Sequence, residues 1–181
     1  GYSAVLRAGN LKLRSGEAQA ADEFSRTEGG FSRFNFDVNH VSKLSKVTQF
    51  YIFAHGQLAN RNLDSSEQFY LGGADAVRAY PQGEAGGDSG YQATAELRYQ
   101  TPVKGMSMTL FADVGEVLAR KDGDTSDPHR RLAGWGIGAV YSLDRSLYAR
   151  LDYARKIKGE SYRSEAEDKN GRLWFRLYKL F

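Results

Sequence analysis

The chain has 181 residues and a formal net charge of +3, from 25 basic and 22 acidic residues. These mixed charges form no basic cluster of the kind that binds nucleic acid, and the absence of cysteine excludes disulfides and thiolate zinc sites. No run of about 18 apolar residues occurs, so no transmembrane helix is predicted. The 20 glycines and the aromatic content of 13% favour an all-β chain.

Eight segments alternate between apolar and polar residues with the period of two that is typical of β-strands. In chain order they are 2–14, 29–41, 45–58, 90–101, 106–118, 131–143, 146–157 and 172–181. Short turns are predicted at 42–44, 102–105 and 144–145, and long polar loops at 15–28, 59–89, 119–130 and 158–171. No helical period competes with these strands.

Short turns and long loops alternate regularly along the chain, which is the layout of an antiparallel outer-membrane β-barrel. The predicted strands of 10 to 14 residues match a tilted crossing of a bilayer. A soluble sandwich or a lipocalin-like binder shows the same alternation, with one face in a core and the other in water. Strand length, unequal loops and aromatic residues near strand ends favour the membrane barrel. These aromatic residues are Tyr91, Tyr99, Tyr153 and Phe181.

The polar face of several predicted strands carries charges of both signs. These residues are Arg33, Asp37, Glu96, Arg98, Asp113, Arg150 and Asp152. In a barrel they would face the lumen, where opposite charges can pair, whereas on a soluble sheet they would be ordinary exterior residues.

The longest predicted loop, 59–89, is rich in glycine and leads directly into an alternating strand. Loops of this length are uncommon unless they are functional or disordered. Its apolar and aromatic residues argue against disorder. They are Phe69, Leu71, Val77 and Tyr80. The cation between residues 68 and 90 is Arg78.

Other kinds of site find little support in the sequence. The three histidines, His40, His55 and His129, lie on separate segments without the spacing of metal ligands. The aspartates of segment 122–127 lack the downstream glutamate of a calcium loop. No nucleophile elbow or phosphate-binding loop is present. We therefore predict no catalytic residue, no metal and no cofactor, and a protein that is not an enzyme.

Two motifs in the chain are similar to motifs of a known protein family. The tip of loop 59–89 consists of Val77, Arg78, Ala79 and Tyr80. Segment 106–118 carries Phe111, Asp113 and Gly115. These runs resemble the V-R-G-Y loop tip and the F-x-D-x-G strand motif of outer-membrane transporters of two-partner secretion, the hemolysin-activator and filamentous-hemagglutinin-transporter family of the barrel-assembly superfamily. The resemblance covers essentially the whole chain.

The resemblance implies a fold and a function. Such proteins have two POTRA domains and a 16-stranded barrel, so we expect residues 1–181 to be a single barrel domain without POTRA domains, the carboxy-terminal half of the parent barrel. The resemblance implies a translocator that secretes a large partner such as a hemolysin or adhesin across the outer membrane of a Gram-negative bacterium. Loop 59–89 would be a plug or gate in the lumen, and the folding of the partner outside would drive export.

The resemblance also pairs two residues that alternation alone leaves apart. By themselves, Arg78 reads as a solvated loop residue and Asp113 as a solvated lumen carboxylate. With the resemblance we predict a bidentate ion pair that latches the loop inside the lumen. Ala79 departs from the family's glycine, and a positive φ there would strain the backbone. In a half barrel the lumen is narrower or differently built, and the loop would be displaced outward.

A self-sufficient eight-stranded outer-membrane barrel with an adhesion or surface-interaction role remains the alternative, because eight strands can close around a filled interior. Unpaired sheet edges are not tolerated in lipid. The chain must therefore close on itself, associate with a second copy or adopt another curvature. Pairing between 2–14 and 172–181 would indicate closure.

Overall fold

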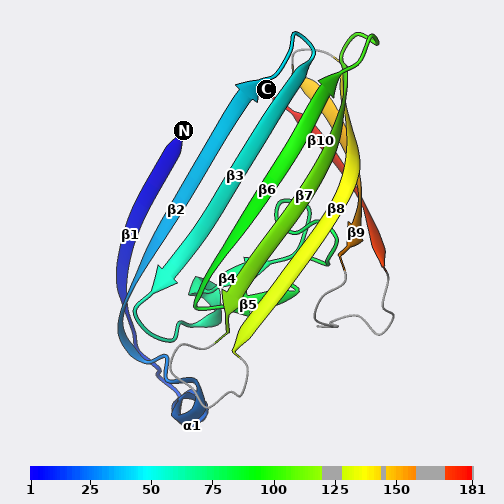
Figure 1. Ribbon diagram of the computed structural model, residues 1–181. Coiled ribbons are helices and arrows are strands. Elements are labelled where there is room, and N and C mark those ends of the chain that lie inside the picture. The colour runs from blue at the N-terminus through cyan, green and yellow to red at the C-terminus, as the bar shows by residue number, and fades with distance from the viewer. Residues whose placement is uncertain (120–127, 144–145, 158–169, 181) are drawn as a thin grey trace.

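The computed structural model describes residues 1–119, 128–143, 146–157 and 170–180. Within these ranges, eight long strands form one antiparallel sheet in the order β1-β2-β3-β6-β7-β8-β9-β10 (Figure 1). The prediction of an all-β, barrel-type fold is confirmed. The predicted turn at 144–145, the acidic segment 122–127 and Phe181 lie outside the described residues.

Each predicted strand has a counterpart in the sheet. The strands are β1 (Tyr2–Leu11), β2 (Gly29–Lys43), β3 (Thr48–Ala59), β6 (Ser89–Gln100), β7 (Met106–Leu118), β8 (His129–Ser142), β9 (Leu147–Lys156) and β10 (Gly171–Lys179). The turn predicted at 42–44 lies after Lys43 instead, because the backbone N–H groups of Leu44 and Ser45 donate to Thr48 O and close the hairpin there.

The predicted loop 15–28 contains a helix, α1 (Gly16–Ser25), so the expectation of no helix was wrong. Ser15 caps its N-terminus by accepting a 3.2 Å hydrogen bond from Ala18 N. Arg26 closes the C-terminus in the left-handed conformation, with φ of 52°. The sequence lacks a helical period because α1 buries no residue.

A carboxylate clamp holds the end of α1. Asp22 accepts hydrogen bonds of 2.6 Å from both the backbone N–H and the hydroxyl of Thr27. Ser25 Oγ and Glu28 N donate to the same carboxylate at 2.8 and 3.1 Å. These bonds, those from Thr27 first, hold the pKa of Asp22 well below its usual value.

This clamp predicts a pH dependence. Because the pKa of Asp22 is lowered by folding, its contribution is fully present at neutral pH and is lost only as pH falls through the depressed folded value. We expect slow amide hydrogen exchange at Thr27 and Glu28 to persist near pH 4, where ordinary carboxyls take up protons. Asp22→Asn should remove this protection at neutral pH and Glu17→Gln should not. Equal protection in both variants would contradict the clamp.

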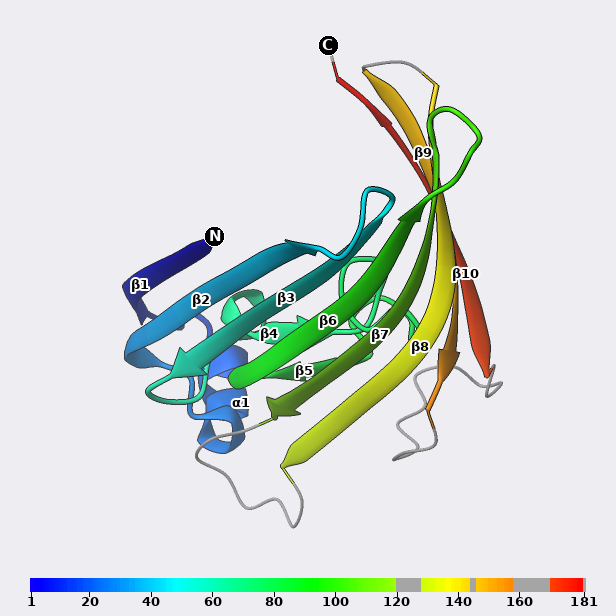
Figure 2. The same ribbon diagram turned by 45° about the horizontal axis from the view of Figure 1, so that its top comes forward.

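The sheet is curved and open. β1 pairs with β2 and β10 with β9, and no pairing joins β1 to β10 among the described residues. The two edge strands lie well apart in Figure 2. The closed eight-stranded barrel that the alternative requires is therefore not what this chain forms.

The two faces of the sheet differ as the alternation predicts. On β8 the buried Gly134 and Gly136 alternate with Trp135 and Ile137, which are 46% and 51% exposed. Tyr91, Tyr99 and Tyr153 also lie on this outer, apolar face. The inner face lies in the hollow of the sheet, and loop 59–89 folds over it (Figure 2).

Loop 59–89 is itself folded. It contains the 3₁₀ turn η1 (Ser65–Glu67) and a two-stranded sheet of β4 (Phe69–Leu71) and β5 (Ala85–Gly87). These strands are too short to show alternation, so the sequence predicted only a loop. Beyond β4 the chain turns through Gly72 and Gly73, with φ of 86° and 116°. The expected outward displacement is wrong, because the loop lies on the inner face (Figure 1).

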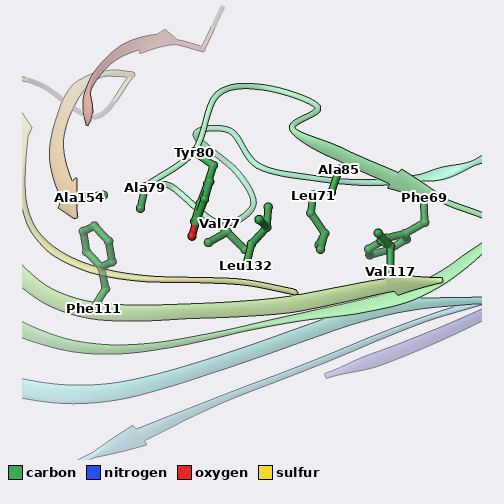
Figure 3. Packing of buried hydrophobic residues seen from close by; sticks show 10 residues of the cluster. All are labelled: Phe69, Leu71, Val77, Ala79, Tyr80, Ala85, Phe111, Val117, Leu132 and Ala154. Carbon is green, nitrogen blue, oxygen red and sulfur yellow. The ribbon is translucent and has the colours of Figure 1, made fainter. Parts of the chain in front are cut away.

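The hydrophobic core lies between this loop and the inner face of β7, β8 and β9 (Figure 3). It consists of Phe69, Leu71, Val77, Ala79, Tyr80, Ala85, Phe111, Val117, Leu132 and Ala154. The apolar anchors seen in the sequence thus bury themselves against the sheet. None of the described helices combines the length and the apolar character needed to cross a bilayer.

Candidate functional site: the loop tip on the inner face

Arg78, at the tip of loop 59–89, is buried against β7 with 3% of its surface exposed. Its Nε and Nη2 donate to the two carboxylate oxygens of Asp113 at 2.9 and 2.7 Å. The backbone N–H of Arg78 adds a third hydrogen bond of 3.2 Å to the same side chain. The structure therefore brings together, in bidentate geometry, the two residues that the resemblance paired.

Further groups surround the guanidinium. Its Nη1 donates to Glu96 Oε1 on β6 at 2.9 Å. Its carbon lies 3.3 Å from the centroid of the Phe111 ring, so the cation also faces an aromatic surface. Thr94 Oγ1 donates to Asp113 at 3.0 Å and orients that carboxylate. Arg78 is thus held on several sides by residues of β6 and β7.

The other predicted lumen charges belong to one network with this pair. Glu96 accepts from Arg98 at 2.6 Å and from Arg150 at 3.0 Å. Arg150 also reaches Asp152 at 2.7 Å. Opposite charges alternate through the network, so each buried carboxylate has at least one cationic neighbour.

Arg33 and Asp37 lie apart from the network. Arg33 Nη2 contacts Glu67 at 2.8 Å and ties β2 to η1 near the base of the loop. Asp37 contacts His55 Nδ1 at 2.6 Å. Beside this pair, a groove of about 470 Å³ stays open between β1, β2, β3 and the loop. The loop therefore covers the inner face without filling the whole hollow.

Each residue of the strand motif has a separate physical task. Phe111 faces the guanidinium of Arg78, and Asp113 accepts its hydrogen bonds. Gly115 leaves space for the loop, because a Cβ there would lie 2.6 Å from Leu71 Cδ2. At successive positions of the inner face, the motif thus provides an aromatic ring against the guanidinium, a carboxylate that accepts its hydrogen bonds, and a residue without a side chain that leaves space for the loop.

Ala79 occupies the tip without the predicted strain. Arg26 is the non-glycine residue with positive φ in the described part of the chain, so Ala79 does not adopt that conformation. The Ala79 methyl group packs against β8, where a Cβ on Gly134 would lie 2.6 Å from it. The alanine at the tip is therefore accommodated by a glycine on the wall.

Sequence reasoning missed two contributors to this site, both on β10. Trp174 Nε1, on β10, donates to the backbone carbonyl of Arg78 at 2.7 Å. Arg176, two positions further, contacts Asp75 in the loop and Asp152 in the wall. Their signal was available, since Trp174 and Arg176 alternate with the exposed Leu173, Phe175 and Leu177.

The arrangement is suited to holding a segment in place. Among the residues described, no group of three or more histidine, cysteine, aspartate or glutamate side chains is placed to hold a metal ion. The carboxylates of the site are engaged by arginines, and what the geometry provides is a docked, buried loop tip in a charged wall.

The chain is similar to known proteins both in sequence and in structure. The heme/hemopexin transporter protein HuxB of Haemophilus influenzae strain Rd is 32% identical over 111 residues, which are 59% of this chain and 20% of HuxB. The structure of CdiB from Acinetobacter baumannii matches 84% of this chain and 27% of CdiB, with a TM-score of 0.64 and 22% identity. At that identity the CdiB likeness shows the fold alone.

The chain thus spans about a fifth of the length of the curated relatives that it matches. The family model for the haemolysin secretion/activation proteins ShlB/FhaC/HecB matches residues 5–141. The predicted resemblance to the transporters of two-partner secretion is thereby confirmed. On the strength of this match, the chain belongs to the ShlB/FhaC/HecB family of haemolysin secretion/activation proteins.

Proposed function

We propose that this chain is part of an outer-membrane translocator that secretes a large partner protein across the outer membrane of a Gram-negative bacterium. Loop 59–89 acts in it as a plug or gate. The observation that carries the proposal is the buried pair of Arg78 and Asp113, which holds the loop tip against the inner face. Membership of a secretion family supports the activity.

The energetics of the pair suit a gate. A buried ion pair is close to break-even against desolvation, so a wide network can hold the tip without locking it irreversibly. Arg98 and Arg150 already contact Glu96, so withdrawal of Arg78 leaves that carboxylate with cationic partners. Asp113 lacks such a second arginine among the described contacts and is the group that most strongly favours the docked loop.

The outer face of the sheet supports contact with lipid. Large apolar side chains project from it, including Leu110, Trp135, Ile137, Leu151 and Phe175. In a bilayer these would meet hydrocarbon, while the charges of the inner face would meet water or protein. The open edges at β1 and β10 would be completed by further strands of the parent barrel or by a second copy.

The test is secretion by the full-length transporter with Arg78→Ala. We expect less partner protein outside the cell at an unchanged amount of barrel inserted in the outer membrane, because the plug no longer docks. Arg7→Ala is the matched control, since Arg7 is an arginine of β1 that lines the open groove and takes no part in the ion pairs described around Arg78. Normal secretion by the inserted Arg78→Ala protein would show that the pair is not a functional latch.

A further inference from the structure

We infer that β10 is a second docking wall for loop 59–89, and that Trp174 and Arg176 on this strand position the loop tip. Trp174 Nε1 donates to Arg78 O at 2.7 Å. Arg176 Nη1 contacts the carboxylate of Asp75, three residues before Arg78. The meaning of this wall for secretion rests on the proposed function, but docking can be measured without any secretion.

The tip is held from two directions. The side chain of Arg78 points to Asp113 on β7, while its backbone carbonyl accepts from Trp174 on β10. β7 and β10 are separated in the sheet by β8 and β9. Three strand spacings correspond to roughly 14 Å along the sheet. The tip therefore spans the hollow of the curved sheet and joins two walls that do not pair with each other.

Arg176, the residue of β10 that contacts Asp75, is itself held in place by the neighbouring strand. Arg176 Nη2 lies 2.9 Å from Asp152 on β9, a carboxylate that is fully buried. This bond orients the guanidinium, so its other terminal nitrogen faces the loop. Arg176 is thus a bridge between the network of the sheet and Asp75.

The two anchors differ in their access to water. The Asp75 side chain is 85% exposed, whereas those of Arg78 and Asp113 are 4% and 1% exposed. Salt screens exposed charge pairs far more than buried ones. The contact between Asp75 and Arg176 is therefore the outer, salt-sensitive part of the docking, and the pair of Arg78 and Asp113 is the inner part.

The chain carries its own reporter of docking. Arg78 is the sole lysine or arginine between Arg61 and Arg98, and Ala79 follows it. Trypsin can cleave after Arg78 when the loop leaves the wall, and the cleavage rate follows the population of the undocked form when docking is fast. Cleavage after Arg78 with Arg98 still protected therefore measures local undocking in an intact sheet.

We expect Trp174→Phe to raise the cleavage rate after Arg78 about five-fold, the effect of one lost hydrogen bond. Asp75→Asn should raise it about two-fold, as for an exposed ion pair. High salt should raise the cleavage rate of the wild-type protein close to that of the Asp75→Asn variant. It should change the cleavage rate of the variant itself little. All rates are divided by those of a peptide with the same residues around position 78.

Trp135→Phe is the matched control, because Trp135 is the chain's other tryptophan and lies on the outer face of β8. It should leave the cleavage rate unchanged, and it leaves Trp174 as the sole indole. In that background, Asp113→Ala should shift the emission of Trp174, because the indole loses its partner when the loop undocks.

The inference is overturned if Trp174→Phe and Asp75→Asn are cleaved at the wild-type rate while Asp113→Ala is cleaved faster. It is also overturned if the Trp174 emission stays constant when the loop undocks. Either result leaves the plug proposal standing. Normal secretion by the Arg78→Ala variant, by contrast, would show that the pair of Arg78 and Asp113 is not a functional latch. It would leave the inference that the loop docks on β10 unaffected.

Discussion

Replacement of Asp113 by alanine is expected to raise the rate of tryptic cleavage after Arg78 by a factor of about a hundred or more. Asp113 accepts three hydrogen bonds from Arg78 and is 1% exposed. Loss of one partner from a buried pair destabilises by about 3–5 kcal/mol, because the remaining charge stays desolvated. Glu96 still contacts the guanidinium at 2.9 Å and keeps the effect toward the lower end of that range.

In the Asp113→Ala variant, the loop can avoid this cost by leaving the inner face. A guanidinium without its main acceptor is better hydrated outside the wall, so the expected state is an undocked loop on an intact sheet. Asp37→Ala is the control, because Asp37 is an aspartate of β2 whose side chain bonds to Ser3 and His55. If both variants are cleaved at the wild-type rate, the loop does not depend on Asp113.

Replacement of Gly134 by alanine should also release the loop, through sterics alone. The new Cβ would lie 2.6 Å from the Cβ of Ala79, a residue that is buried with 1% of its surface exposed. Overpacking of this kind costs about 1–3 kcal/mol, which corresponds to a rise in tryptic cleavage of about five-fold to a hundred-fold. No charge changes in this variant.

The double variant Gly134→Ala with Ala79→Gly tests the cause directly. Removal of the Ala79 methyl group relieves the main clash, and the remaining 3.2 Å approach to Arg155 O requires a shift of only a few tenths of an ångström. We expect the cleavage rate to return close to that of Ala79→Gly alone. Gly30→Ala serves as the control, since its Cβ would meet nothing nearer than Gly9 O at 4.0 Å. Equal rates in the single and double variants would contradict this packing.

Alternation along the chain determined the strands and their faces. β7 (Met106–Leu118) has the predicted bounds, because the period of two is a local property that each strand carries in its own residues. The charged inner face followed in the same way. The partnership of Arg78 with Asp113 did not, since alternation places Asp113 on the polar face of its strand and says nothing about Arg78, which lies in a loop. It came from the resemblance of two motifs.

What the sequence left open depends on contacts between distant residues or on segments without a periodic signal. α1 was missed because it buries no face, and β4 and β5 because three residues show no alternation. Trp174 and Arg176 were missed because their loop partners lie 96 and 101 positions away.

The sequence by itself therefore determined an all-β chain with one apolar and one charged face. Only the tertiary structure decided that the sheet stays open at β1 and β10, that Ala79 fits because Gly134 faces it, and that the loop tip spans from β7 to β10. The reason is physical: side-chain direction follows from local backbone geometry, whereas strand closure and loop docking follow from which distant surfaces meet.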